Sequence, residues 1–172
     1  MSQKKREAVI IILICNAILI SLLELMIPIP VPIPGIKLGL GNIITLIAIA
    51  FLDFKDVLTI VFLRCIVVAI LSKGITALPF SLTGGILSGI AMWLLYKKAL
   101  RFFSIKGISV VGAIIHNTAQ LMVASLILGE SVLFYYIPVL LVSAVITGFI
   151  TGSISELTVR EIEKRGIFKD IH

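Results

Sequence analysis

The first long apolar run, AVIIILICNAILISLLELMI (residues 8–27), decides the class of protein. A helix of about 20 residues spans about 30 Å, which matches the hydrocarbon thickness of a bilayer. Secretory signal peptides have a shorter apolar segment of about 7–15 residues, followed by a small-residue cleavage site, and this run is followed by prolines instead. We therefore expect residues 8–27 to form a membrane-spanning helix rather than a removable signal.

The rest of the chain shares this apolar character. Of its 172 residues, 59% are hydrophobic and 14% are charged, and the mean hydropathy is +1.19. Soluble domains average about 45–50% apolar and about 25% charged residues, so a soluble fold of this composition would lack polar side chains for its surface. The composition predicts an all-α integral membrane protein with a single membrane domain.

Hydropathy and helix-breaking residues divide the chain into six predicted membrane-spanning helices. The second and third have only about 15 residues each, so they could instead form one re-entrant pair. A solvated helical tail, residues 156–172, contains Glu–Arg pairs four residues apart and then Gly166 as a helix stop. The six predicted spans are 8–27, 38–52, 57–72, 79–96, 108–128 and 134–155.

The positions of Lys and Arg predict the orientation in the membrane. With the N-terminus inside, twelve of the 15 basic residues fall in cytoplasmic segments, whereas Lys37 and Lys73 fall in external loops and Arg64 lies within a span. This distribution follows the positive-inside rule and predicts that both termini are cytoplasmic. The net charge of +6 therefore reflects topology and contact with anionic lipids rather than a nucleic-acid surface.

Polar residues within the predicted spans are candidates for function, because ionisable groups are unfavourable inside a bilayer. Arg64 lies near the middle of the third span, and His116, Asn117 and Gln120 share one side of the fifth. Arg64 and His116 are predicted to lie at nearly the same depth and could face one cavity. Arg64 would there balance the charge of a small anionic substrate. The alternative is an internal polar network, in which Arg64 binds helix carbonyls or Asn16.

The stretch PIPVPIPGIKLGLGN (residues 28–42) joins the first two predicted spans. Its four prolines predict an extended strap, and its glycines allow tight turns into the second span. Such a loop could cover a cavity that opens outward, with Lys37 and Asn42 within reach of a ligand. A rigid connector between tilted helices would have the same composition, so both interpretations stay open.

Small residues at intervals of four predict close helix–helix contacts. The stripes in the fourth and sixth spans are expected to pack within the chain, whereas Ala17 and Ser21 in the first span could receive a partner subunit. Cys15 and Cys65 lack the spacing of zinc ligands and are expected to pack as small apolar residues. The two internal stripes are Gly85–Gly89 and Ala144–Gly148–Gly152.

Signatures of catalysis are missing from the sequence. It contains no HExxH, GxSxG, GxGxxG or P-loop motif, so we expect no enzyme activity, no cofactor and no ATP site of its own. Active transport by this chain would then depend on other subunits that supply the energy.

The segment GIKLGLGNIITLIAIAFL (residues 35–52), the HN pair in the fifth span and the six short spans resemble the Gx transporter family. This family is also labelled heptaprenyl diphosphate synthase component I, and it is similar to the substrate-binding S components of energy-coupling-factor (ECF) transporters. The resemblance covers about residues 8–160. It implies a subunit of the bacterial cytoplasmic membrane that works with a transmembrane coupling subunit and two ATPase subunits.

The resemblance also implies positions for binding and docking. In S components the substrate lies near the outer face, beneath the loop between the first two spans. The first span usually docks the coupling subunit through an Ala-xxx-Ala motif, and here Ala17 and Ser21 occupy that place. The implied substrate-binding residues, together with Arg64, are Lys37, Gly39, Gly41, Asn42, His116, Asn117 and Gln120.

The synthase label implies a different role. Prenyl-elongating enzymes hold Mg²⁺-diphosphate through Asp-rich motifs, because several carboxylates must bind the metal ions. This chain has only Asp53, Asp56 and Asp170, so it is not expected to be the catalytic subunit. Three functions stay open: an ECF-type substrate-binding subunit for an isoprenoid or quinone precursor, a non-catalytic membrane subunit of the synthase, and an autonomous facilitator.

Overall fold

The computed structural model describes residues 3–27, 39–72 and 74–166. In these ranges the chain forms α-helices and two short 3₁₀-helices and no strand, which confirms the prediction of an all-helical fold. The Pro-rich segment and Lys37 lie outside the described residues. The elements are α1 (Gln3–Glu24), α2 (Asn42–Phe51), α3 (Phe54–Leu71), η1 (Ile75–Ala77), α4 (Leu78–Ala99), α5 (Ile105–Leu128), η2 (Ser131–Tyr136) and α6 (Ile137–Arg165).

Four segments of the described chain are long and apolar enough to cross a bilayer. They indicate a multi-pass membrane protein, whereas six full spans and cytoplasmic termini stay predictions. Helix α3, at the third predicted span, is not among these four segments. It has 18 residues but carries three charged ones, Lys55, Asp56 and Arg64. The four segments are Gln3–Glu24, Ile75–Ala99, Ile105–Leu128 and Ser131–Arg165.

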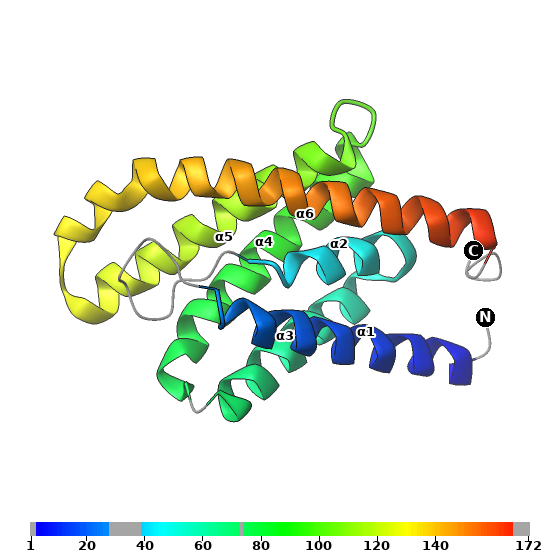
Figure 1. The fold of residues 1–172 in the computed structure, drawn as a ribbon, viewed down its shortest axis with the longest axis horizontal. Coiled ribbons are helices and arrows are strands. Elements are labelled where there is room, and N and C mark those ends of the chain that lie inside the picture. Colours follow the sequence, from blue (N-terminus) through cyan, green and yellow to red (C-terminus); the bar gives the residue numbers. More distant parts are fainter. Residues whose placement is uncertain (1–2, 28–38, 73, 167–172) are drawn as a thin grey trace.

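The helix α2 is shorter than the predicted span 38–52. It has 10 residues, about 15 Å of helix, because the chain turns through Gly39–Gly41 before it begins. It contacts all five other α-helices, and residues 42–49 are all buried. A helix that is apolar all round belongs in the interior of the protein. Thus α2 forms the centre of the bundle, where protein rather than lipid surrounds it (Figure 1).

The other helices pack around α2 with the most extensive contacts between α5 and α6 and between α4 and α5. Small residues make the α5–α6 contact close, because a Cβ added at Gly148 would lie 2.6 Å from the Cα of Val110. A Cβ at Gly152 would lie 2.7 Å from the Cα of Lys106. The predicted internal packing of this stripe is therefore confirmed. On α4, a Cβ added at Gly85 would lie 3.0 Å from the Val61 side chain of α3, whereas one at Gly89 would lie 3.8 Å from it, an ordinary contact distance.

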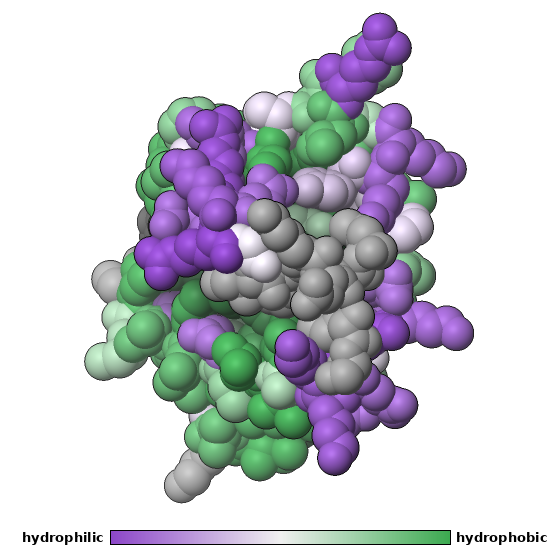
Figure 2. Space-filling model, turned by 90° about the vertical axis from the view of Figure 1, so that its right-hand side faces the viewer, coloured by the Kyte–Doolittle hydropathy of each residue, from purple (hydrophilic) through white to green (hydrophobic). Residues whose placement is uncertain are grey.

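The first turn of α1 and the last turn of α6 lie at the same end of the molecule (Figure 1). Figure 2 looks onto this end and shows hydrophilic side chains around it. Ion pairs join its helices: Arg6 binds Asp56 at 2.6 Å and Asp53 at 2.9 Å, and Lys106 lies 3.8 Å from Glu156. A same-side arrangement of the two ends fits an even number of membrane crossings.

The end of α6 agrees with the sequence prediction for the tail. The helix continues to Arg165 and stops at Gly166, whose φ of +65° lies in the left-handed region that glycine adopts readily. Both predicted ion pairs are present along this helix. They are Glu156–Arg160 and Glu161–Arg165.

Candidate functional site

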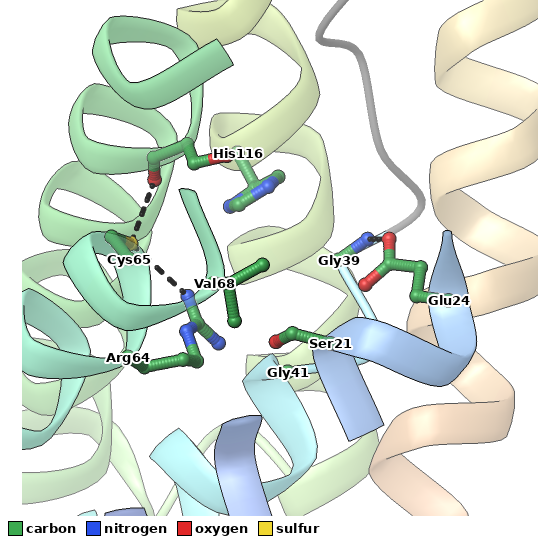
Figure 3. A pocket seen from close by; sticks show the side chains of 9 residues that line it. Ser21, Glu24, Gly39, Gly41, Arg64, Cys65, Val68 and His116 are labelled. Atoms are coloured by element: carbon green, nitrogen blue, oxygen red, sulfur yellow. Dashed lines mark hydrogen bonds between the residues drawn. The ribbon is translucent and has the colours of Figure 1, made fainter. Parts of the chain in front are cut away.

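A small pocket lies among α1, α3, α4, α5 and the turn before α2 (Figure 3). Its volume is about 20 Å³, which is room for about one water molecule. In this conformation the pocket is therefore too small to hold a larger ligand. The residues that line it are Ser21, Glu24, Gly39, Gly41, Arg64, Cys65, Val68, Ser81 and His116.

The guanidinium of Arg64 forms one wall of this pocket. Arg64 is 5% exposed. Within the described residues its guanidinium donates one long hydrogen bond, 4.0 Å from Nη2 to the sulfur of Cys65. No carboxylate of the described residues lies within 4.0 Å of its nitrogens. A guanidinium has five N–H donors, so most of this buried cation has no protein partner in the described chain.

Glycines create the space that the Arg64 side chain occupies. A Cβ added at Gly41 would lie 2.0 Å from Nη1 of Arg64, and one at Gly85 would lie 3.1 Å from Nη2. The requirement for Gly41 is one of space, because its φ of −58° suits any residue. Gly41 therefore belongs to the site through its missing side chain.

Glu24 holds the turn that brings Gly41 to this position. The residue is 3% exposed, and its carboxylate accepts hydrogen bonds from the backbone N–H groups of Gly39, at 2.6 Å, and Leu40, at 3.1 Å. Gly39 has a φ of +81°, which disfavours any residue with a Cβ. The end of α1 is thus tied to the start of α2 at the edge of the pocket. Glu24 is the sole acidic residue within the predicted spans, which is the signal that could have marked it as a site residue.

His116 lies across the pocket from α1 and is 3% exposed. Its Nδ1 lies 3.5 Å from the hydroxyl of Ser88, and this hydroxyl in turn donates to the carbonyl of Gly85. The structure thus brings Arg64 and His116 to one pocket, as their similar predicted depths suggested. Ligand binding by Arg64 and His116 in this pocket stays a prediction.

The other predicted binding residues of α2 and α5 take different positions. Gln120 is fully buried and packs against Gly84 of α4. Asn117 turns toward α6, where its Nδ2 donates to the carbonyl of Leu140 at 3.5 Å. Asn42 is 2% exposed, lies close to Gly39, and finds no hydrogen-bond partner for its amide among the described residues. None of these three side chains lines the pocket.

The comparison with known protein families matches residues 13–158, most of the chain, to heptaprenyl diphosphate synthase component I. The protein belongs to this family. Neither the comparison with curated proteins nor that with solved structures found a match.

Two acidic residues of this component I family member, Asp53 and Asp56, do not line the pocket. Asp53 and Asp56 both bind Arg6 and so join the first turn of α1 to the start of α3. Asp56 accepts from both Nε and Nη2 of Arg6, at 2.9 Å and 2.6 Å. The ion pairs of both carboxylates with Arg6 therefore link α1 to the start of α3.

The partner-docking role expected of Ala17 and Ser21 in α1 stays a prediction. Ala17 and Ser21 are 1% and 6% exposed and pack within the chain, Ser21 beside Gly41. A partner subunit could reach them only if α1 moved away from α2 and α3. Asn16 is exposed and donates to the carbonyl of Ile12, so it is not the partner of Arg64. Cys15 is likewise exposed rather than packed, whereas Cys65 is buried.

Proposed function

We propose that the protein is a substrate-binding subunit of the bacterial cytoplasmic membrane that captures a small anionic molecule at the Arg64 pocket. The observation that carries this proposal is the buried guanidinium of Arg64, which faces the pocket and has no carboxylate partner among the described residues. A buried charge without a partner is strongly unfavourable. An anionic ligand group would supply the missing charge-assisted hydrogen bonds.

The proposed substrate class is an isoprenoid diphosphate or a related anionic precursor. Membership of a family named for heptaprenyl diphosphate synthase supports the isoprenoid part. The planar guanidinium supports the anionic part, because it can donate two parallel hydrogen bonds to one phosphate group. A diphosphate exceeds the volume of about 20 Å³, so binding must widen the pocket. We propose that the wall formed by Glu24 and the Gly39 turn moves to admit the ligand, because this turn is not part of a helix and is tied to α1 by hydrogen bonds to Glu24.

We further propose that the subunit works as the S component of an ECF-type importer. The small all-helical membrane domain and the buried polar pocket support this role, and the sequence has no ATP-binding motif of its own. The partners would be a transmembrane coupling subunit and two ATPase subunits. Co-purification of these proteins and ATP-dependent uptake would support the importer. Uptake by this chain alone would instead indicate a facilitator.

The family name favours a second function, a non-catalytic membrane subunit that holds a soluble prenyl synthase at the bilayer. Binding of such a synthase to the purified protein, with uptake unchanged when the gene is deleted, would support this alternative. The hydrophilic end of the bundle offers a surface for a soluble partner (Figure 2).

The ligand proposal is tested by thermal unfolding of the protein in nanodiscs with inorganic diphosphate, a short prenyl diphosphate and the matching uncharged prenol. The prenyl diphosphate is expected to raise the melting temperature, whereas the prenol leaves it unchanged, because only an anion can pair with Arg64. Stabilisation by the prenol alone, or by neither compound, would contradict the proposed substrate class.

A Gly41→Ala variant tests the same pocket through the glycine that makes room for the Arg64 side chain. The added methyl group would overlap the Arg64 guanidinium and displace it, so we expect affinity for the prenyl diphosphate to fall about tenfold or more. Gly89→Ala is the matched control, because its Cβ would meet its nearest neighbours at 3.8 Å, an ordinary contact distance. Equal affinities in the two variants, measured by calorimetric titration, would place the ligand elsewhere.

A further inference from the structure

The outer face of α1 carries a polar side chain among large apolar ones. Asn16 is exposed there, between Ile12 at 58% and Leu19 at 59% exposure. Its Nδ2 donates to the carbonyl of Ile12 at 2.8 Å, and its carbonyl oxygen has no recorded partner in the described chain. Asn16 lies near the middle of the apolar run 8–27, so in a bilayer this amide would face lipid tails. An unpaired polar group is unfavourable there.

The spacing of the exposed residues on this face is that of a two-helix seam. Ile12, Asn16, Leu19 and Leu23 follow one another at intervals of four, three and four, and all four are exposed. An apolar seam with this repeat packs against a second helix of the same pattern, and one Asn within it fixes the register. The outer face of α1 thus has the residue spacing and the polar marker of a helix-pairing surface.

The Asn16 amide is complementary to a second copy of itself. It has a free N–H donor and a carbonyl acceptor, so two such amides can exchange hydrogen bonds reciprocally. A twofold axis along the membrane normal places both copies of Asn16 at the same depth, as an isologous interface requires. A helix of another protein would need a polar residue at that same depth, a condition that an identical copy meets automatically.

We propose that the protein forms a homodimer in the membrane through the outer face of α1, with reciprocal hydrogen bonds between the two Asn16 side chains. Ala17 and Ser21 lie on the buried side of the same helix, so this contact leaves the packing of α1 against α2 and α3 undisturbed. The Arg64 pocket is lined from that buried side and stays intact. The dimer is therefore independent of the function proposed for the pocket.

Cys15 provides a native probe of this interface, because it is exposed next to Asn16 whereas Cys65 is buried. Copper phenanthroline applied to membranes that contain the full chain is expected to give a disulfide-linked dimer. Cys15→Ala should abolish the product. As a matched control, Val145→Cys in the Cys15→Ala background places a thiol on the exposed face of α6, 48% exposed, and should give no dimer above background.

Asn16→Leu tests the proposed hydrogen bonds directly. Energy transfer between labelled copies in lipid vesicles is expected to show a dissociation constant about tenfold higher than that of the wild type. Asn16→Gln keeps the amide and should retain most of the association. Because residue 16 is exposed, the melting temperature of each monomer should be unchanged. No Cys15-dependent product, a crosslink to a protein of another mass, or an unaltered dissociation constant in Asn16→Leu would each overturn the proposal.

Discussion

Replacing Arg64 with Met is expected to weaken binding of the anionic ligand strongly while leaving the empty protein at least as stable as the wild type. Met keeps much of the length of the side chain and removes a buried charge that has no carboxylate partner in the described chain. Apolar replacement of buried charges is often neutral or stabilising. Loss of one partner of a buried charge pair in a complex costs about 2–5 kcal/mol, so affinity should fall about 30-fold or more. Calorimetric titration and thermal unfolding measure the two effects separately.

Two further variants sharpen this result. Arg64→Lys keeps the charge but loses the planar fork of donors, so we expect an affinity between those of the wild type and Arg64→Met. Lys55→Met removes an exposed positive charge at the hydrophilic end and should change neither affinity nor melting temperature. A strongly destabilised Arg64→Met protein would show that the guanidinium is part of an internal polar network, the alternative that the sequence left open.

A Gly148→Val substitution is expected to have the largest effect on stability. The Cβ would lie 2.6 Å from the Cα and 3.1 Å from the backbone nitrogen of Val110, so α5 and α6 must separate to admit it. Backbone atoms cannot rotate away as a flexible side chain can, so the cost is expected at the upper end of that for overpacking, about 3 kcal/mol. This is a large fraction of the total stability of a typical domain. We expect a lowered melting temperature and loss of the monodisperse peak in detergent.

Gly107→Ala on α5 is the matched control for this effect. Its Cβ would meet its nearest neighbours at 3.5 Å and 3.6 Å, which are ordinary contact distances. The variant should be as stable as the wild type or slightly more so, because Ala favours a helix over Gly. Similar melting temperatures for the Gly148 and Gly107 variants would show that α5 and α6 do not pack as closely as the structure indicates.

The sequence by itself determined the features that depend on neighbouring residues. The apolar run at 8–27, the helix stop at Gly166 and the ion pairs of the tail all act within one helix, where the 3.6-residue repeat fixes which residues meet. The close packing at Gly148 could also be predicted, because small residues four positions apart allow another helix to approach closely. Helix rise also predicted that Arg64 and His116 could face one cavity, and both line the pocket.

Tertiary structure alone decided which side of each helix faces the protein. On α1, Ala17 and Ser21 turn inward while Asn16 turns outward, and on α5, His116 reaches the pocket while its neighbour Asn117 turns to α6. In a soluble protein polar residues mark the outer face, but here lipid and protein interior are both apolar, so hydropathy does not separate them. Contacts between residues distant in sequence made the choice, as where Glu24 holds the Gly39 turn and so carries Gly41 to Arg64.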